Sequence, residues 1–384
     1  MMCSSKIDPS ISFNSSATKI RIGPCRARLL GARLAIGLVF LVLLMMPATA
    51  LSTPPVKLTI LGYGVDDFDK EYIRTVVRPF ELAHPGVEIS YYPVRDSRRA
   101  MEVLDAQSPE PVIDIVIIDL ANAAMAKSNG LLARMDARLI PNASDLKAYG
   151  RDLDFFALPL MYDSLSLIYA KSAFSAPPRS WRELWSKKYR HRTAISTSHT
   201  VNSSMIGLTV IANRLAGGAD GAPSLEPGLR RLERLGPNVL TWKPQPSTFW
   251  LVSKQEALLA VDWNSRGQSQ ARRLGGYALS VPREGTIAVP LMIARVAGRP
   301  NGDMAQRFIN HALSPRAQAA FCESMFYAPS NRRAKLSADA QARVPLASQI
   351  PPAKLIPLDW TSFTLDRYAS IGSWWQRRII KPEH

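Results

Sequence analysis

Apolar side chains recur with two different spacings in the part of the chain that follows residue 55. The segment "VKLTILGYG" alternates and then loosens into glycine, which predicts a strand that ends in a loop. In "DDFDKEYIRTVVRPFELAHPG" the helical spacing of the apolar side chains predicts a helix with one buried face: Phe68, Ile73, Val76, Val77 and Phe80. The near-continuous apolar run "VIDIVIID" is typical of a strand that is buried on both faces of a parallel sheet.

Further strands and helices alternate with these three segments. The segment "VEISYYPV" predicts a second strand, and an amphipathic segment runs from Ser97 to Ala106. The segment "LANAAMAKSNGLLARMD" predicts a helix that closes near Asn129 and Gly130. Because strands and helices alternate three times over this stretch, we expect a doubly wound α/β unit.

The second half of the chain predicts another α/β unit between two extended crossings. The first crossing, Asp154–Phe174, contains two extended runs around Asp163 and Ser164, and the second is Tyr277–Val296. Between them we expect the strand "TAIST", a helix from Ser203 to Ala216, a helix in "PGLRRLERLG", and a helix in "SKQEALLAVDW" that runs into a strand. The tail ends in an amphipathic helix, "WTSFTLDRYASIGSWWQRRI".

The N-terminal residues have the pattern of a secretory signal peptide. Arginines precede the apolar run Leu34–Met46, and Ala48 and Ala50 stand at the small-residue positions of a cleavage site. We therefore expect residues 1–50 to be removed; the alternative is a retained anchor, for which the apolar run is short. Cleavage would leave Cys322 as the single cysteine, which excludes an intramolecular disulfide.

Composition and motifs narrow the function classes. The formal net charge is +17, but the Arg-rich pieces "RRLERL" and "RRLGG" lie among apolar helical residues, which indicates a solvated basic surface and no nucleic-acid partner. No HExxH, CxxC, GxSxG, GxGxxG or P-loop motif is present. We therefore predict that the protein is not an enzyme and has no cofactor and no metal site.

Several phrases, taken in order, resemble the periplasmic solute-binding proteins of ABC importers, in the spermidine/putrescine, ferric-iron and thiamine branch. The matching phrases are "FELAHPGVEISYYPV", "IDIVIIDLANAAMAKSNGLLARMD", "FFALPLMYDSLSLIYAKSAFSAPPRSWRELWSKKYRHRTAIS", "VDWNSRGQ" and "INHALSPRAQAAFCESMFYAPSNRRA". The resemblance implies a type II two-lobed α/β fold in which each lobe is a doubly wound sheet and a two-strand hinge joins the lobes. It also implies closure of the lobes on a solute.

The resemblance sets the expected domains and partners. We expect residues 51–155 and 290–384 to form lobe 1 with the C-terminal helices, and residues 156–289 to form lobe 2 with the hinge crossings. The expected partners are a small-molecule solute and an ABC permease at the inner membrane, with the protein itself a monomer in the periplasm. A ligand-binding module for a sensor is an alternative with the same fold.

Family ligands lie where the carboxyl ends of strands meet helix N-termini from both lobes. The positions that match this rule are the candidate ligand-binding residues: Tyr63, Asp119, Tyr162, Asp163, Ser196, Ser198, Asn202, Ser203, Trp263, Asn264, Arg266 and Tyr327.

The nature of the solute stays open between several classes. The polyamine-binding members of the family use carboxylates and aromatic rings, and here Asp119 and Asp163 are the remaining candidate anions. The segment "STSHTVNSS" replaces acidic residues of that pattern and leads into a helix, where it would bind an oxyanion or where Asn202 or Ser203 would merely cap the helix. A zwitterion bound by Asp119 and this segment satisfies both features. An oxyanion or phosphonate, or ferric iron, is the alternative ligand.

Overall fold

The computed structural model describes residues 54–108, 110–150, 153–197, 202–220, 224–346 and 355–380. The predicted signal peptide, residues 1–50, and the candidate residue Ser198 lie outside these ranges. Within them, no helix is both long and apolar enough to cross a membrane.

The sheet of the first lobe is parallel at one edge. Strand β1 (Val56–Tyr63) lies between β2 (Val87–Val94) and β3 (Ile115–Asp119), and all three run in the same direction. Strand β9 (Ala288–Arg295) then pairs antiparallel with β3. The parallel pairing brings the carboxyl ends of β1 and β3 to the same edge of the sheet.

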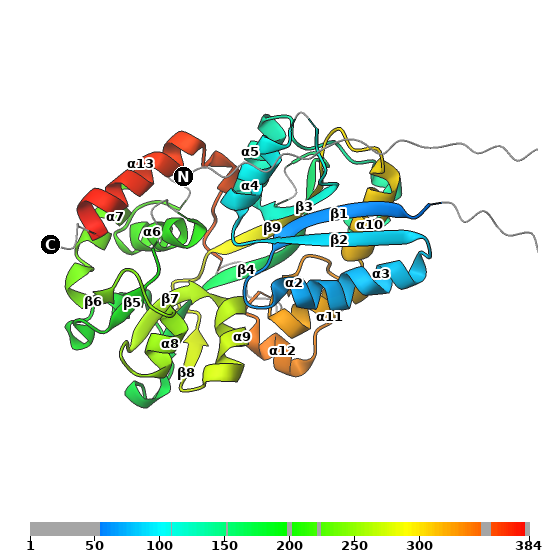
Figure 1. Cartoon of the computed structure of the whole chain (residues 1–384). Helices are drawn as coiled ribbons and strands as arrows, with labels where there is room; N and C mark the ends of the chain where they lie inside the picture. The colour runs from blue at the N-terminus through cyan, green and yellow to red at the C-terminus, as the bar shows by residue number, and fades with distance from the viewer. Residues whose placement is uncertain are drawn as a thin grey trace, which may run out of the picture. The chain divides into compact units, whose positions relative to one another are not determined.

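Helices cover both faces of this sheet (Figure 1). Ile115 and Ile117 of β3 pack in one hydrophobic cluster with α2, α3, α10 and α11, whereas Val116 and Ile118 pack in another with α4 and α5. The strand is therefore buried on both faces, as its apolar run predicts. The bounds of these helices are α2 (Phe68–Tyr72), the π-helical turn η1 (Ile73–Val77), α3 (Arg78–Ala83), α4 (Ser97–Ala106), α5 (Leu120–Ser128), α10 (Gly302–Ala312), α11 (Pro315–Met325) and α12 (Ala338–Arg343).

One long strand, β4 (Ala157–Ala170), belongs to both sheets. Its first half pairs with β9, and its second half pairs with β7 (Leu259–Trp263) and β8 (Tyr277–Ser280). All of its residues are buried. The two extended runs predicted around Asp163 and Ser164 form one continuous strand, whose pairing passes from β9 to β7 after Ser164.

The second lobe is built on the order β4-β7-β5-β6. Strand β5 (Thr193–Ile195) runs parallel to β7 and to β6 (Val239–Thr241). No helix forms within "KQEALL", contrary to the prediction; the preceding helix ends at Ser253, and Gln255 takes a left-handed conformation (φ 60°) that stops it. The helices of this lobe are α6 (Ser203–Leu215), α7 (Glu226–Glu233), α8 (Thr248–Ser253) and α9 (Asn264–Leu274).

Short elements complete the two lobes. The two-residue strand β10 (Ala328–Pro329) pairs with β4. Short 3-10 helices occur at η2 (Ala137–Leu139), η3 (Pro141–Asp145), η4 (Lys171–Ala173), η5 (Trp181–Trp185), η6 (Lys187–Tyr189), η7 (Gly236–Asn238) and η9 (Trp360–Ser362).

The C-terminal segment 355–380, here called the strap, contacts both lobes. It begins beside the hinge, where the N–H of Ile356 donates to the carbonyl of Thr286 at 2.8 Å. It ends in α13 (Leu365–Trp374) and the π-helical turn η10 (Trp375–Ile380), where the Trp375 indole donates to Thr209 of α6 at 3.0 Å. The sequence analysis assigned residues 290–384 to lobe 1, whereas α13 lies on the second lobe. Apolar burial explains this position, because Trp375 and Ile379 are buried in the hydrophobic cluster that includes residues of α6 and α7.

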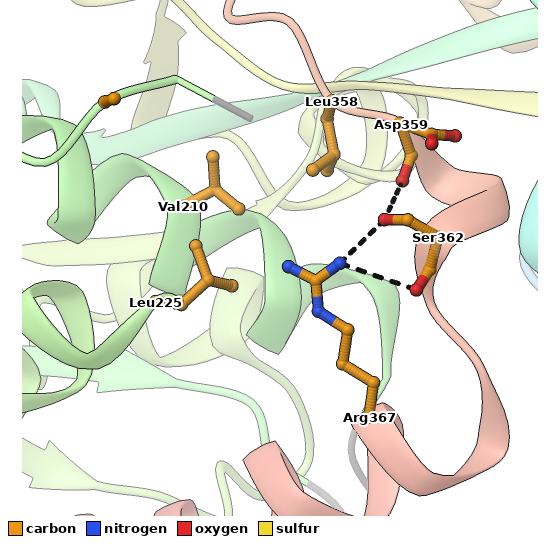
Figure 2. A pocket seen from close by; sticks show the side chains of 7 residues that line it. Val210, Leu225, Leu358, Asp359, Ser362 and Arg367 are labelled. Atoms are coloured by element: carbon orange, nitrogen blue, oxygen red, sulfur yellow. Dashed lines mark hydrogen bonds between the residues drawn. The ribbon is translucent and has the colours of Figure 1, made fainter. Parts of the chain in front are cut away.

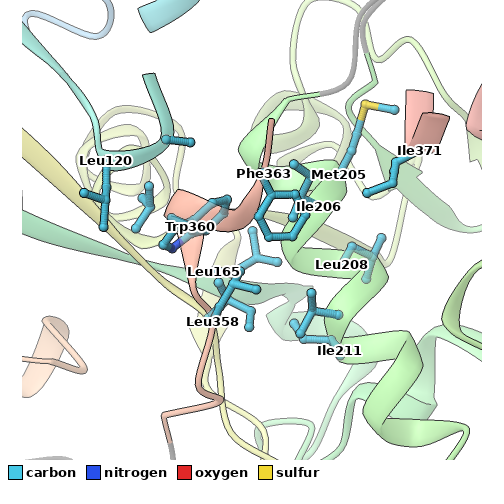
Figure 3. Close-up of a cluster of buried hydrophobic side chains, with 14 of the residues drawn as sticks. Leu120, Leu165, Met205, Ile206, Leu208, Ile211, Leu358, Trp360, Phe363 and Ile371 are labelled. Carbon is cyan, nitrogen blue, oxygen red and sulfur yellow. The ribbon is translucent and has the colours of Figure 1, made fainter. Parts of the chain in front are cut away.

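A hydrophobic cluster ties the strap to both lobes (Figure 3). Trp360 and Phe363 of the strap lie between Leu120 of α5 and Met205 of α6 in the close-up. The Trp360 indole also donates to the carbonyl of Ala288 in β9 at 2.8 Å. In the described part of the chain, three segments therefore cross between the lobes, namely β4, the link from β8 to β9, and the strap. The predicted two-strand hinge omitted the third.

Candidate functional site

The carboxyl ends of β1 and β3 bring the first group of candidate residues together. Tyr63 ends β1, and its hydroxyl shares a hydrogen bond with Ser97, the first residue of α4. The Ser97 hydroxyl accepts the N–H of Asp119, which ends β3, at 2.9 Å. Tyr63, Ser97 and the backbone N–H of Asp119 thus form one hydrogen-bonded chain at the edge of the first sheet.

Asp119 is the N-cap of α5. Its Oδ1 accepts the backbone N–H of Asn122 at 3.0 Å, and the Asn122 side-chain amide donates to both carboxylate oxygens at 3.0 and 2.9 Å. Asp119 is 9% exposed, so its charge lies in a partly desolvated place. Among the described residues, the groups that donate hydrogen bonds to this carboxylate are amides, and no lysine or arginine forms an ion pair with it. The anion is therefore oriented but not neutralised by the chain.

The charge of Asp119 affects the pKa of two buried tyrosines. Burial raises the pKa of Tyr63, and the negative charge of Asp119 raises it further. Burial likewise raises the pKa of Tyr368 on α13, and Asp119 is again the charged group that adds to the effect. Both phenols therefore stay neutral at physiological pH.

The sequence analysis missed Ser97, Asn122 and Tyr368. Asn122 stands three residues after Asp119, which is the spacing of a helix-capping interaction and was a usable signal. Tyr368 lies in the tail helix, for which the sequence predicted only an amphipathic pattern. No local pattern says that this helix returns to Asp119.

Asp163 and Tyr162 do not present free polar groups to a solute. Asp163 is 5% exposed, and its carboxylate accepts the N–H of Ser265 at 3.1 Å and the Ser265 hydroxyl. Burial raises the pKa of Asp163 from its ordinary value near 3.8 to about 7, against the lowering effect of these hydrogen bonds. The Tyr162 hydroxyl donates to the carbonyl of Tyr149 at 2.8 Å, and its ring belongs to the core of the first lobe.

The start of α9 carries the candidates of the second lobe. Trp263 ends β7 and is half-buried, and the amide of Asn264 donates to the carbonyl of Phe326 at 3.4 Å. The Arg266 guanidinium contacts Asp66 at 2.6 Å and lies 3.7 Å from Asp262, so acidic residues of the chain already surround it. These charges raise the pKa of Arg266, with Asp262 the largest cause.

Tyr327 connects the two groups of candidates. It is 8% exposed and follows α11, and its ring packs against Phe68 in an edge-to-face contact at 5.8 Å. Burial raises the pKa of Tyr327, and the charge of Asp163 adds to that effect. Tyr327 also contributes to the raised pKa of Tyr63. The structure therefore brings Tyr63, Tyr327 and Asp163 into one region between the sheets.

The start of α6 has the cap that its sequence predicts. Asn202 Oδ1 accepts the N–H of Met205 at 2.9 Å and the hydroxyl of Ser204 at 2.7 Å. Ser203 is the first helical residue, and Ser196 follows β5 directly. Asn202 therefore serves as a helix cap, whereas Ser198 and His199 lie outside the described residues.

The two pockets described in the structure lie away from these residues. One is lined by Val210, Leu225 and Leu358 together with strap residues; there Arg367 donates to the Ser362 hydroxyl at 2.7 Å and anchors the start of α13 (Figure 2). The other is lined by residues that include Leu104 and Val296. Neither pocket includes a candidate residue, so the candidate site rests on the clusters at the strand ends.

A family model decides the classification. The model for bacterial extracellular solute-binding proteins matches residues 75–347. The chain belongs to this family. The family is one of solute-binding proteins, and the fold between β1 and α13 agrees with the type II architecture of its structural neighbours.

Three relatives show how the bacterial extracellular solute-binding family varies. A gamma-aminobutyric acid-binding protein from Pseudomonas aeruginosa is 23% identical over 57% of this chain and 62% of its own length, which is less than two thirds of that protein. A periplasmic protein from Salmonella typhi, named for an assumed ligand, 2-aminoethylphosphonate, is 24% identical over 68% of this chain and 74% of its own length. The crystal structure of the spermidine/putrescine ABC transporter substrate-binding protein from Streptococcus pneumoniae has a TM-score of 0.68 at 17% identity, and the match covers 84% of this chain and 100% of that one.

Proposed function

We propose that the protein is the solute receptor of an ABC importer and that it binds a small zwitterion between its lobes. The zwitterion carries an ammonium group at one end and a carboxylate or phosphonate at the other. Two of the relatives are named for ligands of this kind, gamma-aminobutyric acid and 2-aminoethylphosphonate. The chain offers matching chemistry on its two lobes.

Asp119 is the group that we expect to bind the ammonium, and its setting is the observation that carries the proposal. Asp119 is 9% exposed, Asn122 aligns its carboxylate, and its charge raises the pKa of the buried phenols of Tyr63 and Tyr368. A carboxylate in a low-dielectric place attracts a cation strongly, and aromatic faces add cation–π attraction.

The start of α6 is the group that we expect to bind the anion. The side chain of Asn202 accepts the N–H of Met205. The N–H groups of Ser203 and Ser204 precede Met205 in the first turn of the helix, and we expect them to face the solute. Such groups and the helix dipole favour a negative charge. Ser196, at the end of β5, would add a hydroxyl donor. Arg266 is a weaker candidate, because Asp66 and Asp262 already flank it.

A long polyamine fits this chain less well than a zwitterion does. A dication needs a carboxylate at each end, and Asp163 is the second candidate. That carboxylate is held by Ser164 and Ser265, and with a pKa of about 7 it is partly protonated near neutral pH. Asp119 is then the one well-placed anion among the predicted site residues.

The proposal also covers how the solute reaches a membrane permease. Secretion through the leader at residues 1–50 would place the protein outside the inner membrane, where closure of the lobes presents both of them to a permease. We propose that the receptor works as a monomer. A sensor protein as the partner would use the same closure.

A thermal-shift panel tests the ligand class. The protein is unfolded in guanidinium, dialysed to remove bound solute and refolded, and is then heated with compounds of five kinds. These are 4-aminobutyrate and 2-aminoethylphosphonate, putrescine and spermidine, phosphate and methylphosphonate, thiamine, and ferric citrate. A ligand at 100 times its Kd adds about 2.7 kcal/mol to stability, which a melting curve resolves.

We expect the zwitterions to raise the melting temperature most. A shift with polyamines alone would contradict the proposal and would mean that Asp163 acts as a second anion site. A shift with phosphate or methylphosphonate alone would contradict the role of Asp119 and leave the α6 start as the main determinant.

A further inference from the structure

The turn between β1 and α2 has an unusual backbone. Asp66 and Asp67 both lie in the left-handed region, with φ of 53° and 68°. Residues with a β-carbon populate this region sparsely, and two in succession need support from surrounding contacts. Lys70 of α2 supports this turn from within the first lobe, through an ion pair with Asp67 at 2.7 Å, and further contacts come from the other lobe.

One face of α9 reaches the two aspartates. Arg266 Nε donates to Asp66 Oδ2 at 2.6 Å, and Gln270 Nε2 donates to Asp66 Oδ1 at 2.7 Å. Arg273 forms an ion pair with Asp67. The three donors are four and three residues apart on the helix, so they share one face.

These contacts join groups that belong to different sheets. The turn continues β1 of the first sheet, whereas α9 follows β7 of the second. The Asp66 side chain is 14% exposed and that of Arg266 is 38% exposed, so solvent screens this pair less than a pair on the open surface. Arg266 also stacks on Phe249 at 5.6 Å, which fixes its direction.

We propose that this set of five residues, here called the latch, holds the two lobes together. Its donors and acceptors are all side chains of the protein, so movement of the lobes is sufficient to form or break these contacts. A latch that favours the arrangement in which the lobes are in contact raises the fraction of molecules ready to enclose a solute. Removing it would lower that fraction and the apparent affinity together. The affinity part rests on the proposed function, and the lobe-distance part does not.

The test measures the distance between the lobes in the protein without added solute. Spin labels are placed at Tyr92→Cys on β2 and Leu240→Cys on β6, which are 56% and 42% exposed, while Cys322 is buried and stays unlabelled. Distance distributions are then recorded by double electron–electron resonance at low salt and in 1 M NaCl. The latch variant is Asp66→Asn with Asp67→Asn, and the control is Glu88→Gln with Asp105→Asn, two exposed acids for which no ion pair is seen in the described part of the chain.

We expect the latch variant to show a larger population of long distances than the wild type. High salt should shift the wild type in the same direction and leave the variant nearly unchanged. The control should match the wild type. Arg273→Gln, on the exposed side of the latch, should give a smaller shift and serves as a second variant that does not endanger folding.

Equal distance distributions in the wild type, the latch variant and Arg273→Gln would overturn the proposal. Once a solute is identified, the latch variant should bind it about five- to tenfold more weakly, because the apparent Kd rises as the competent fraction falls. If no tested solute binds, the proposed function fails while the distance measurement still decides whether the latch exists.

Discussion

Two of the contact regions between the lobes have opposite character. At the strap, Trp360 and Phe363 are each 1% exposed and join α5 to α6 through apolar contacts (Figure 3). At the latch, half-exposed ions on α9 contact Asp66 and Asp67. Apolar burial is insensitive to salt and scales with the area removed from water. Half-exposed ion pairs contribute little to stability and weaken with salt.

This difference predicts different roles for the strap and the latch. The strap makes the two lobes one folding unit, since it contributes residues to the largest hydrophobic cluster. The latch is a set of contacts that lobe movement can exchange at small cost. We therefore expect damage to the strap to change unfolding, and damage to the latch to change the lobe arrangement.

The largest effect is expected at Trp360. Its indole is 1% exposed and donates to the carbonyl of Ala288, so Trp360→Ala removes buried area and a hydrogen bond and leaves a cavity. Such a change costs about 3–5 kcal/mol of unfolding free energy. Urea denaturation measures the loss. The matched control is Trp374→Ala, where the tryptophan is half-buried; an equal loss there would contradict the central place of Trp360.

The next effect is a pH dependence at Asp163, on the strand that both lobes share. Burial raises the pKa of Asp163 to about 7, so between about pH 4 and 7 the folded protein keeps a proton that the unfolded chain has released. Stability from this group therefore falls as the pH rises through that window, by up to about 1.4 kcal/mol per pH unit. Asp163→Asn keeps acceptor and donor groups for Ser265 but removes the titration.

Denaturation curves at pH 4.5, 5.5, 6.5 and 7.5 measure this difference. Asp163→Asn should gain stability relative to the wild type as the pH rises, and Asp105→Asn should show no such trend. A constant difference between Asp163→Asn and the wild type across the series would show that Asp163 does not titrate in this range.

A smaller effect is expected at Tyr368, where the strap meets the proposed solute site. The charge of Asp119 raises the pKa of its phenol, so we expect the Tyr368 ring to contact the bound ammonium and Tyr368→Ala to remove that contact. Cation–π contacts contribute about 0.5–2 kcal/mol, which predicts a loss of affinity of roughly three- to thirtyfold in calorimetry. Tyr368→Phe keeps the ring and should retain most of the affinity. If both variants bind like the wild type, the strap does not contribute to the site.

The smallest effect on unfolding is expected at the latch. Arg273 is 56% exposed in its ion pair with Asp67, so Arg273→Gln should change the unfolding free energy by less than about 0.5 kcal/mol. Urea denaturation checks this value. A loss comparable to that of Trp360→Ala would erase the distinction between strap and latch.

Local patterns predicted most of the fold. The amphipathic segment Ser97–Ala106 coincides with α4, and the apolar run at β3 is buried on both faces because apolar residues occur at every position. The placement of α13 could not be predicted, because the side chains that hold it, Thr209 and Glu233, lie far from it in sequence. The amphipathic pattern of a helix shows that one of its faces must be buried, but it does not show which surface buries that face.

The candidate site was predictable only in part. The rule that ligands lie at the ends of strands points to Tyr63 and Asp119, and the structure connects them through Ser97. Arg266 is typical of an anion-binding residue in the sequence. Its engagement by Asp66 depends on a left-handed turn of two aspartates, for which the residue types give no strong signal. Contacts between lobes are set by tertiary structure.

Calorimetric titration with three ligands of matched length tests the central claim most directly. The ligands are 4-aminobutyrate, butyrate and butylamine, and each is titrated into the wild type and Asp119→Asn; Asn caps a helix as well as Asp does, so α5 should remain intact. We predict that the zwitterion binds at least a hundredfold more tightly than either half-molecule. Asp119→Asn should remove about 2–5 kcal/mol of that binding free energy. Equal affinity for butylamine and 4-aminobutyrate, or an unchanged affinity in Asp119→Asn, would contradict the account.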